Sequence, residues 1–528
     1  GTQAGTILLK DMLPGAGSAD PRDLVAVDDL LFCTAQVGRQ LWVSDGTPAG
    51  TDTVRTFPNI GAIKEEGLIA LNGLLLFAVN SPGVEDELWA TDGTYAGTTL
   101  LHTFTPGNSE GIDAFTFHVH DNALYFMGSD GPAGREVWRS DGTVGGTFLL
   151  KDIHTEAQNS SDLWDPNFIT FNDTLFFTAN SVGYDYELWK SDGTTAGTQR
   201  VKDITPGVGG SGIRDLTIVG TKLFFPAVVS GSSELWATDG TEAGTYKVAD
   251  VGDPHELTAL GNWLVYVDDV VALNMGTEPW RSDGTPGGTT MITEINAGPD
   301  DGVLWNGTFF QEVDGVLYFR GNDGVSGEEL WRTDGTALGT AQVKDLYPGP
   351  NDGFINNATW SLPVGNALLF DAVNAQLGNT IPELWISDGT AVGTYRLTIN
   401  TFGDGSLPGR PVRSGDLLFF AANNGTHGRE LWALDATPLS TAVPEQVPAA
   451  AVTVHPVPAT DRLFVQWAAG AGSAGRLRIL DLQGREVLHA PWNGDRAVLD
   501  IEALPQGHYV LQVREHTGRQ ATATFSKQ

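Results

Sequence analysis

Short apolar runs separated by turn residues fill the first 437 residues, and one motif recurs among them at regular intervals. The most complete copy reads Glu-Leu-Trp-Arg-Thr-Asp-Gly-Thr at residues 329–336. Its spacing ranges from 44 residues, between Trp236 and Trp280, to 54 residues, between Trp331 and Trp385. This recurrence predicts a repeat protein. An aspartate follows each motif tryptophan three residues later, and the nine tryptophans are Trp42, Trp89, Trp138, Trp189, Trp236, Trp280, Trp331, Trp385 and Trp432.

Each repeat divides into four predicted strands. Before the tryptophan, an apolar run is interrupted by a two-residue turn such as Asn72-Gly73 or Asp314-Gly315. These residue types tolerate the positive φ of a tight hairpin, so the run predicts two paired strands. The tryptophan lies in the third strand, and the Asp-Gly-Thr turn leads into a fourth, for example residues 342–346. Four short antiparallel strands per repeat are typical of a β-propeller blade.

The two ends of the repeat region complement each other. The ninth repeat stops at residues 435–437 and has no fourth strand after its turn, whereas residues 1–11 contain the tail of a motif and a fourth strand. We therefore expect the N-terminal strand to complete the last blade, which gives a nine-bladed propeller without open edges. The alternative is that the chain is cut within a repeat and that Gly1 is not its natural start.

The repeat resembles a family of large bacterial surface proteins that is defined by its Glu-Leu-Trp-x-x-Asp-Gly-Thr sequence. The resemblance covers residues 1–437 and implies a propeller at the cell surface, but little chemistry. Gln40 replaces the motif glutamate in the first copy, and Ala436 replaces the glycine in the ninth.

The sequence pattern changes after the last repeat. Residues 438–450 contain three prolines and no apolar periodicity, which predicts an extended linker. Residues 451–528 contain about seven alternating segments with turn residues between them. This layout predicts a small β-sandwich of the immunoglobulin-like type, so the whole chain is expected to be all-β.

The last 78 residues resemble the C-terminal sorting domain of the type IX secretion system of Bacteroidota. Three ordered motifs and the closing residues carry the resemblance, although Val457 stands where the family usually has asparagine. The resemblance implies export across the outer membrane by the type IX machinery, to the cell surface or the extracellular space. The residues taken as the sorting signal are His455, Pro456, Pro458, Asp481, Gly484, Pro505, Gly507, Tyr509 and Lys527.

Charge separates the two regions. The chain has 65 acidic and 30 basic residues, and residues 451–528 account for 7 and 8 of these, so the first 450 residues carry a balance of 22 − 58 = −36. An acidic surface repels nucleic acid and anionic lipid and attracts cations. No apolar segment is long enough to span a membrane as a helix. Cys33 is the only cysteine, which excludes an intrachain disulfide.

Candidate ligand-binding residues lie outside the repeated motif, in loops of variable length. These loops connect the second strand to the third and one blade to the next, and both kinds emerge on one face of the ring. Exposed aromatic side chains beside acids suit stacking against sugar rings, although a tryptophan outside the motif can also pack beneath a long loop. The predicted ligand-binding residues are Trp164, Asp165, Trp305, Trp360, Asp268 and Asp269.

Calcium is the one cofactor that the loops suggest. Asp300 and Asp301 are adjacent acids in a glycine-rich loop, a pattern that is common in calcium sites and also in simple turns. Both readings stay open from the sequence.

Catalytic motifs are missing from the repeats and the tail. We interpret the chain as a secreted surface propeller that serves adhesion or ligand binding, with an extracellular glycan or protein as the partner. The alternatives are a polysaccharide-degrading enzyme on a propeller scaffold and a structural subunit of an extracellular or secretion-system assembly.

Overall fold

The computed structural model divides the chain into two compact units, Gly1–Ser440 and Thr441–Gln528. The predicted linker, residues 438–450, lies outside the described part of the chain. The described residues are 6–13, 18–36, 38–57, 62–81, 85–104, 111–131, 134–154, 166–181, 185–207, 209–269, 275–304, 310–354, 360–374, 379–397, 408–414, 417–423, 429–435, 452–455, 460–467, 475–480, 486–492, 496–515 and 520–527.

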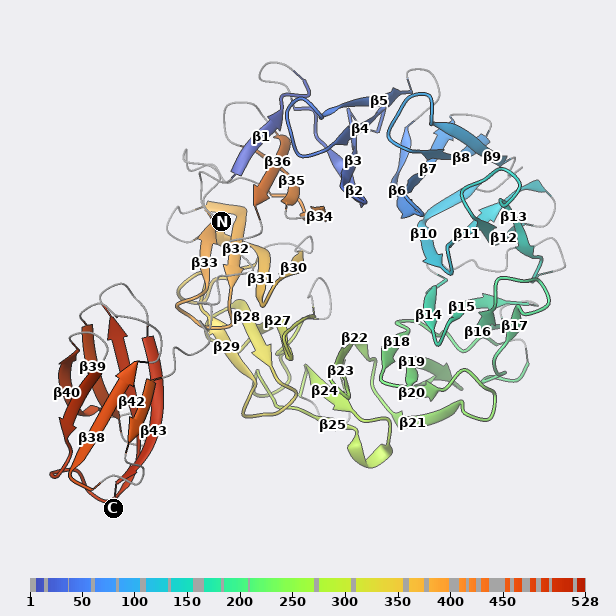
Figure 1. Cartoon of the computed structure of the whole chain (residues 1–528). Helices are drawn as coiled ribbons and strands as arrows, with labels where there is room; N and C mark the ends of the chain where they lie inside the picture. Colours follow the sequence, from blue (N-terminus) through green and yellow to red (C-terminus); the bar gives the residue numbers. More distant parts are fainter. Residues whose placement is uncertain are drawn as a thin grey trace. The chain divides into compact units, whose positions relative to one another are not determined.

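Nine four-stranded antiparallel sheets form a ring in the described part of the first unit, with the first strand of each blade towards the centre (Figure 1). The predicted nine-bladed propeller is confirmed. Blades 1 to 3 contain β2 (Arg22–Val27), β3 (Leu30–Ala35), β4 (Gln40–Ser44) and β5 (Asp52–Thr56); β6 (Ile63–Leu71), β7 (Leu74–Ser81), β8 (Glu85–Thr91) and β9 (Thr99–Phe104); and β10 (Ile112–His120), β11 (Ala123–Ser129), β12 (Arg135–Ser140) and β13 (Phe148–Lys151).

The next three blades follow the same order along the chain. They contain β14 (Ile169–Phe171), β15 (Thr174–Asn180), β16 (Tyr186–Ser191) and β17 (Gln199–Arg200); β18 (Thr217–Val219), β19 (Lys222–Val229), β20 (Ser232–Thr238) and β21 (Tyr246–Asp250); and β22 (His255–Leu260), β23 (Trp263–Asp269), β24 (Thr277–Ser282) and β25 (Thr290–Met291), with the short 3-10 helix η4 (Pro286–Gly288) before β25.

Blades 7 and 8 are regular, and blade 9 takes its fourth strand from the start of the chain. They contain β26 (Gln311–Val313), β27 (Val316–Asn322), β28 (Glu328–Thr333) and β29 (Ala341–Lys344); β30 (Ser361–Val364), β31 (Ala367–Asn374), β32 (Asn379–Ser387) and β33 (Tyr395–Leu397); and β34 (Val412–Ser414), β35 (Leu417–Asn423) and β36 (Arg429–Asp435), completed by β1 (Thr6–Lys10).

The ring closes where β1 pairs antiparallel with β36, with Leu8 opposite Trp432. This pairing confirms the predicted closure by the N-terminal strand. The buried carboxylate of Glu430 strengthens it by accepting the backbone N–H groups of Met12, at 3.2 Å, and Ala19, at 3.3 Å.

Each motif tryptophan packs into the interface with a neighbouring blade. The interface between blades 1 and 2 buries Val27, Phe32 and Leu41 of the first blade against Phe77 and Trp89 of the second. Trp89 stacks on Phe77 with ring centroids 6.4 Å apart. Burial of this kind contributes roughly 1.5–3 kcal/mol for each large apolar side chain, so the hydrophobic core is distributed around the ring.

The Asp-Gly-Thr turn is a closed hydrogen-bonded unit. Asp334 Oδ1 accepts the N–H of Thr336 at 2.9 Å and its hydroxyl at 2.7 Å, and Gly335 supplies a φ of 85°. The hydroxyls of Thr333 and Thr340 lie 2.7 Å apart and close the turn from the other side. The same contacts recur in the other described copies, which assigns the repeated aspartate to turn formation.

The motif glutamate fastens the loop that leads to the next blade. Glu329 is fully buried and accepts the N–H groups of Leu346, at 2.6 Å, and Tyr347, at 3.3 Å. Glu136 and Glu278 make the equivalent pair of bonds. In blades 1, 2 and 5 the equivalent side chain accepts the indole N–H of the motif tryptophan instead, and these side chains are Gln40, Glu87 and Glu234.

The second unit is a seven-stranded β-sandwich within its described residues, as the sequence predicts. One sheet has the order β37-β38-β41 and the other β40-β39-β42-β43. The core includes Leu477, Ile479 and Leu511, and Tyr509 donates its hydroxyl to the carbonyl of Pro505 at 2.7 Å. The strands are β37 (Val452–His455), β38 (Arg462–Trp467), β39 (Gly475–Leu480), β40 (Glu486–Trp492), β41 (Arg496–Asp500), β42 (Gly507–Glu515) and β43 (Gln520–Lys527).

No helix in the described ranges has the length and apolar character that a membrane span requires.

The closure predicts a large effect of a mutation near the start of the chain. Leu9 is 2% exposed and packs with Phe419, Leu431 and Trp42. Leu9→Ala should lower the free energy of unfolding of the propeller by roughly 2–4 kcal/mol, because it leaves a cavity in the closing interface. Urea denaturation followed by tryptophan fluorescence measures this loss. The neighbouring Lys10→Ala should stay within about 0.5 kcal/mol, and equal effects of the two changes would argue against the closure.

The buried glutamates predict how stability depends on pH. Burial raises the pKa of Glu329 from 4.5 to about 8 and that of Glu278 to about 7. Between pH 4.5 and these raised pKa values the folded chain holds protons that the unfolded chain has released. The contribution of these glutamates to stability is therefore complete below pH 4.5 and is lost as the pH rises towards 8. The free energy of unfolding should decrease by roughly a few kcal/mol between pH 5 and pH 8.

The Glu329→Gln variant provides the control for this measurement. It should flatten the pH dependence, because the amide does not titrate. The pKa of the exposed turn aspartates, such as Asp334, is lowered by their hydrogen bonds from threonine. Their contribution to the stability of the propeller is lost only below about pH 4, outside the range of this measurement. An unchanged slope in the variant would contradict the assignment.

Candidate functional site

The first strands of several blades are bulged near their N-terminal ends, at the inner edge of the ring. The register slips between Arg22 and Val25 in β2 and between Ile63 and Leu68 in β6, and similar slips occur in β10 and β22. Left-handed φ is most often adopted by Asn, Asp and glycine. Residues with such φ values in or beside the first strands of the blades include Asp23 (49°), Glu66 (57°), Asn167 (54°), Asp215 (50°) and Glu256 (54°).

These inner residues also connect adjacent blades. The N–H of Glu66 donates to Asp23 Oδ1 at 3.2 Å, between blades 1 and 2. The N–H of Asp215 donates to Asn167 Oδ1 at 3.1 Å, between blades 4 and 5. The inner edge is therefore polar and rigid on the face where the variable loops emerge.

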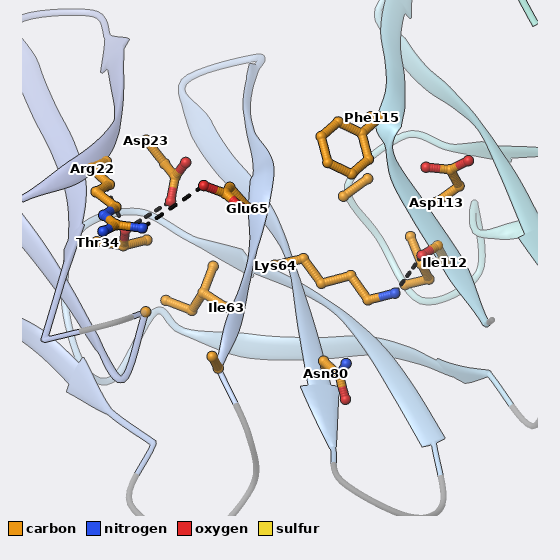
Figure 2. A pocket seen from close by; sticks show the side chains of 13 residues that line it. Arg22, Asp23, Thr34, Ile63, Lys64, Glu65, Asn80, Ile112, Asp113 and Phe115 are labelled. Carbon is orange, nitrogen blue, oxygen red and sulfur yellow. Dashed lines mark hydrogen bonds and ion pairs between the residues drawn. The ribbon is translucent and has the colours of Figure 1, made fainter. Parts of the chain in front are cut away.

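A cavity of about 370 Å³ lies at this edge, across blades 1, 2 and 3 (Figure 2). It is formed by the starts of β2, β6 and β10, so its walls come from three separate repeats. The residues that line it are Arg22, Asp23, Thr34, Gly38, Ala62, Ile63, Lys64, Glu65, Asn80, Ile112, Asp113, Ala114 and Phe115.

Buried ion pairs hold one side of the cavity. Lys64 Nζ donates to Asp86 Oδ2 at 2.7 Å and to the carbonyl of Ile112 at 2.6 Å, so it joins blades 2 and 3. Asp86 also accepts the N–H of Ile112 at 2.9 Å. Arg135 of β12 pairs with Asp113 of β10, across the intervening strand β11 of blade 3. These charges are paired with each other and fix the strands.

The solvent-accessible side chains of the cavity differ from these ion-paired residues. Phe115 is 60% exposed, although it belongs to a strand, and the side chain of Asn80 is also exposed. Arg22 is half exposed, bonds Asp20 at 2.6 Å and lies 3.8 Å from Glu65, which is 70% exposed. The Asp20 carboxylate raises the pKa of Arg22, so this guanidinium stays charged. The cavity therefore combines an aromatic face with an amide, a carboxylate and a cation.

A second cavity of about 550 Å³ adjoins the first at the ring closure and shares Arg22 and Asp23 with it. Three further arginines, Arg410, Arg413 and Arg429, also line it. Four arginines in one cavity are a local concentration of positive charge, because residues 1–450 contain only 22 basic residues against 58 acidic ones.

Three of the predicted ligand-binding residues, Trp164, Asp165 and Trp305, lie outside the described residues. Trp360 is partly buried between blades 8 and 9, and its indole N–H donates to the carbonyl of Pro408 at 3.1 Å. Its role as a sugar-stacking residue stays a prediction.

The structure places the predicted acids around one edge of blade 6. Asp268 is buried and accepts the N–H groups of Gly252, at 3.1 Å, and Asp253, at 2.8 Å. Burial raises the pKa of Asp268. Asp269 is exposed and lies opposite Thr277 in the sheet.

The predicted calcium pair lies near the same edge. Asp301 Oδ1 accepts the N–H of Thr277 at 2.8 Å, and Asp352 makes the equivalent bond to Glu328 in the next blade. Asp300 is exposed. The repeated bond gives Asp301 a structural task, and calcium binding by this pair stays a prediction.

The sorting-signal residues are only partly described. Pro456, Pro458, Asp481 and Gly484 lie outside the described residues, and His455 ends β37. In the described part, Pro505 precedes β42, Gly507 begins it, and Tyr509 stacks on Phe525 at 5.5 Å. Lys527 closes β43.

The sequence analysis did not identify the inner-edge cavity. Its residues are scattered over three repeats and resemble ordinary strand residues when each repeat is considered alone. One available signal was Phe115, because it directly follows Ala114 and so breaks the alternation of apolar and polar residues in β10.

The fold and the tail motifs together define a class: a nine-bladed β-propeller followed in sequence by a small β-sandwich of the secretion-tail type. Residues 453–527 match the family described as the secretion system C-terminal sorting domain. The sorting domain inferred from the tail motifs is therefore confirmed. The chain is type IX secretion cargo and is exported to the cell surface or the extracellular space.

The chain is also similar to several solved structures. The PorZ protein of Porphyromonas gingivalis, titled a surface component of the type IX secretion system, has 11% identity and a TM-score of 0.35 over 96% of this chain and 75% of that one. A puromycin hydrolase has 13% identity and a TM-score of 0.34, over 78% of this chain and 60% of that one. The propeller domain of the trilobed protease of Pyrococcus furiosus has 12% identity and a TM-score of 0.32, over 73% and 98%. No curated protein sequence matches the chain.

The buried pair beneath the cavity predicts a selective loss of stability. Lys64 and Asp86 are 14% and 10% exposed, so Lys64→Met leaves a carboxylate without its cation in a poorly hydrated site. The propeller should lose roughly 2–3 kcal/mol in urea denaturation. Lys247→Met removes a more exposed pair in blade 5 and should cost less than about 1 kcal/mol. Equal losses would show that the Lys64 pair is not structural.

Proposed function

We propose that the propeller is a surface ligand-binding module and that it binds an extracellular glycan at the inner-edge cavity. The observation that carries the proposal is Phe115, an exposed aromatic side chain that lines the cavity together with Asn80, Glu65 and Arg22. Sugar rings present apolar C–H faces that stack on aromatic rings, and their hydroxyls bond to amide, carboxylate and guanidinium groups. Figure 2 shows these side chains on neighbouring strands around the same space.

The adjoining arginines refine the expected ligand. Arg410 and Arg413 are exposed in the second cavity, which shares the lining residues Arg22 and Asp23 with the first. Guanidinium groups bind carboxylate, sulfate and phosphate oxygens in a bidentate manner. A glycan that carries acidic substituents and extends across both cavities therefore fits the site better than a neutral one.

The acids of the cavity favour binding over catalysis. Asp23 accepts the hydroxyl of Thr34 at 2.8 Å, and Asp113 is paired with Arg135. A glycosidase needs one carboxyl group with a raised pKa opposite a second, free carboxylate. Two of the three acids that line the cavity are therefore engaged, and the third, Glu65, lies 3.8 Å from Arg22. This arrangement supports a binding site, and polysaccharide cleavage and a purely structural role remain outcomes of the test below.

Glycan-array binding by the full chain tests the proposal, with neutral and acidic glycans side by side. We expect saturable binding of acidic glycans, and Phe115→Ala should weaken it at least tenfold, which is about 1.4 kcal/mol, because the stacking face is lost. Tyr95→Ala is the matched control: Tyr95 is 72% exposed in the turn between β8 and β9, on the opposite face of the ring, and its removal should leave binding unchanged.

The absence of saturable binding would overturn the glycan proposal and favour a structural ring. Equal losses in the two variants would place the ligand elsewhere. Release of shorter sugars from a bound polysaccharide would show that the propeller is an enzyme, and it would overturn the proposal of a pure binding module.

A further inference from the structure

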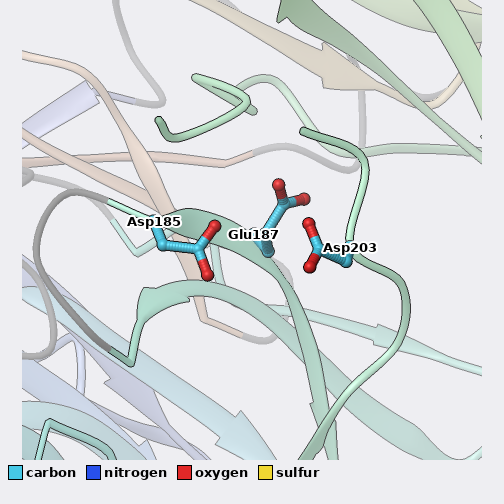
Figure 3. A group of neighbouring side chains, drawn as sticks. All are labelled: Asp185, Glu187 and Asp203. Carbon is cyan, nitrogen blue, oxygen red and sulfur yellow. The ribbon is translucent and has the colours of Figure 1, made fainter. Parts of the chain in front are cut away.

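Blade 4 contains a cluster of three carboxylates that the proposed glycan site does not use. Asp185 directly precedes β16, Glu187 lies within it, and Asp203 follows β17 in the loop to the next blade (Figure 3). One oxygen of each side chain lies within 4.8 Å of the other two. Calcium binds oxygens at about 2.3–2.6 Å, so a single ion can contact three oxygens at such separations.

Two carboxylate oxygens of these residues are buried without a hydrogen-bond donor. Arg200 binds one oxygen of each aspartate, Asp185 Oδ2 at 2.9 Å and Asp203 Oδ2 at 3.1 Å. The second oxygen of each, Oδ1, is inaccessible to solvent and has no hydrogen-bond partner. The Asp185 side chain is only 9% exposed. A buried anionic oxygen without a partner is unfavourable, and a bound cation is one way to satisfy it.

Glu187 supplies the third carboxylate and is already held in place. It is fully buried. Its Oε1 accepts both the N–H and the hydroxyl of Thr205, and its Oε2 accepts the hydroxyl of Ser211, each at 3.0 Å. Each carboxylate oxygen has two lone pairs, so the two bonds from Thr205 occupy Oε1 and orient the group, and a cation would bind through Oε2.

The charge balance points to a divalent ion. Three carboxylates give −3, and Arg200 returns +1, which leaves −2 for a bound cation to neutralise. All the ligand atoms are oxygens, and such donors favour hard cations such as calcium over zinc or copper.

Blade 4 departs from the other repeats at this position. Asp185 lies four residues before the motif tryptophan Trp189, where blades 3, 6 and 7 have Gly134, Gly276 and Gly327. Blade 7 keeps the equivalents of the other two carboxylates, Glu329 and Asp345, and lacks the third. Asp185 therefore adds a third carboxylate to the two that recur where the motif glutamate binds the loop to the next blade.

We propose that Asp185, Glu187 and Asp203 bind one calcium-like divalent cation, which fastens the loop after β17 to the start of β16. The site is independent of the glycan cavity, because that cavity belongs to blades 1 to 3.

Calorimetric titration of the full, metal-free chain with calcium chloride at 0.15 M salt tests the proposal. We expect one site with a dissociation constant of about 10⁻⁴–10⁻³ M or tighter, in the range of extracellular calcium modules. Saturating calcium should also raise the Tm. Asp185→Asn should weaken binding at least tenfold and abolish the Tm shift. Asp345→Asn is the matched control, because blade 7 has only two of the three carboxylates. This variant should keep both calcium binding and the Tm shift.

Three other results of this experiment would overturn the proposed cation site. Weak binding of many ions that is identical in all three proteins reflects the general acidic surface and overturns the site. The absence of any heat or Tm shift in the unmodified chain overturns it too. If Asp185→Asn does not fold, as judged by circular dichroism, Asp203→Asn takes its place, and full calcium binding by that variant would refute the proposal.

Discussion

Every blade of this propeller depends on contact with the next blade to bury its faces. A four-stranded sheet of about 25 residues cannot form a core alone, and the apolar clusters of the described residues lie between blades. The motif tryptophans and leucines supply this interface in each repeat. Because the dependence is circular, the ring is stable only when it closes, and the pairing of β1 with β36 completes it.

The same repeated motif also explains why so many carboxylates are buried in an acidic protein. The glutamate before Leu-Trp accepts two backbone N–H groups of a loop that otherwise has no regular partners. In blades 1, 2 and 5 the side chain at this motif position instead accepts the indole N–H of the tryptophan two residues later in the same strand. One motif position thus performs two related structural tasks, and its conformation depends on which donor is nearby.

Function in such a ring has to come from departures from the repeat. The inner-edge cavity exists because bulges place polar residues of different types at equivalent points of blades 1, 2 and 3, with Phe115 in only one of them. The cluster around Asp185 arises in the same way, from one carboxylate in place of a glycine. Both features lie on the face where the loops vary in length, while the opposite face is occupied by uniform turns.

The sequence alone was sufficient for the repeat, the four strands of each blade, the closing strand and the sorting tail. These features follow from local rules: apolar alternation, turn residues and motif spacing act over a few residues and recur nine times. The cavity and the carboxylate cluster were decided only by the tertiary structure. Arg22, Lys64 and Phe115 are distant in the chain, and Asp185 and Asp203 are separated by two strands and the turn between them. Their proximity results from how neighbouring blades and loops pack, which local patterns do not encode.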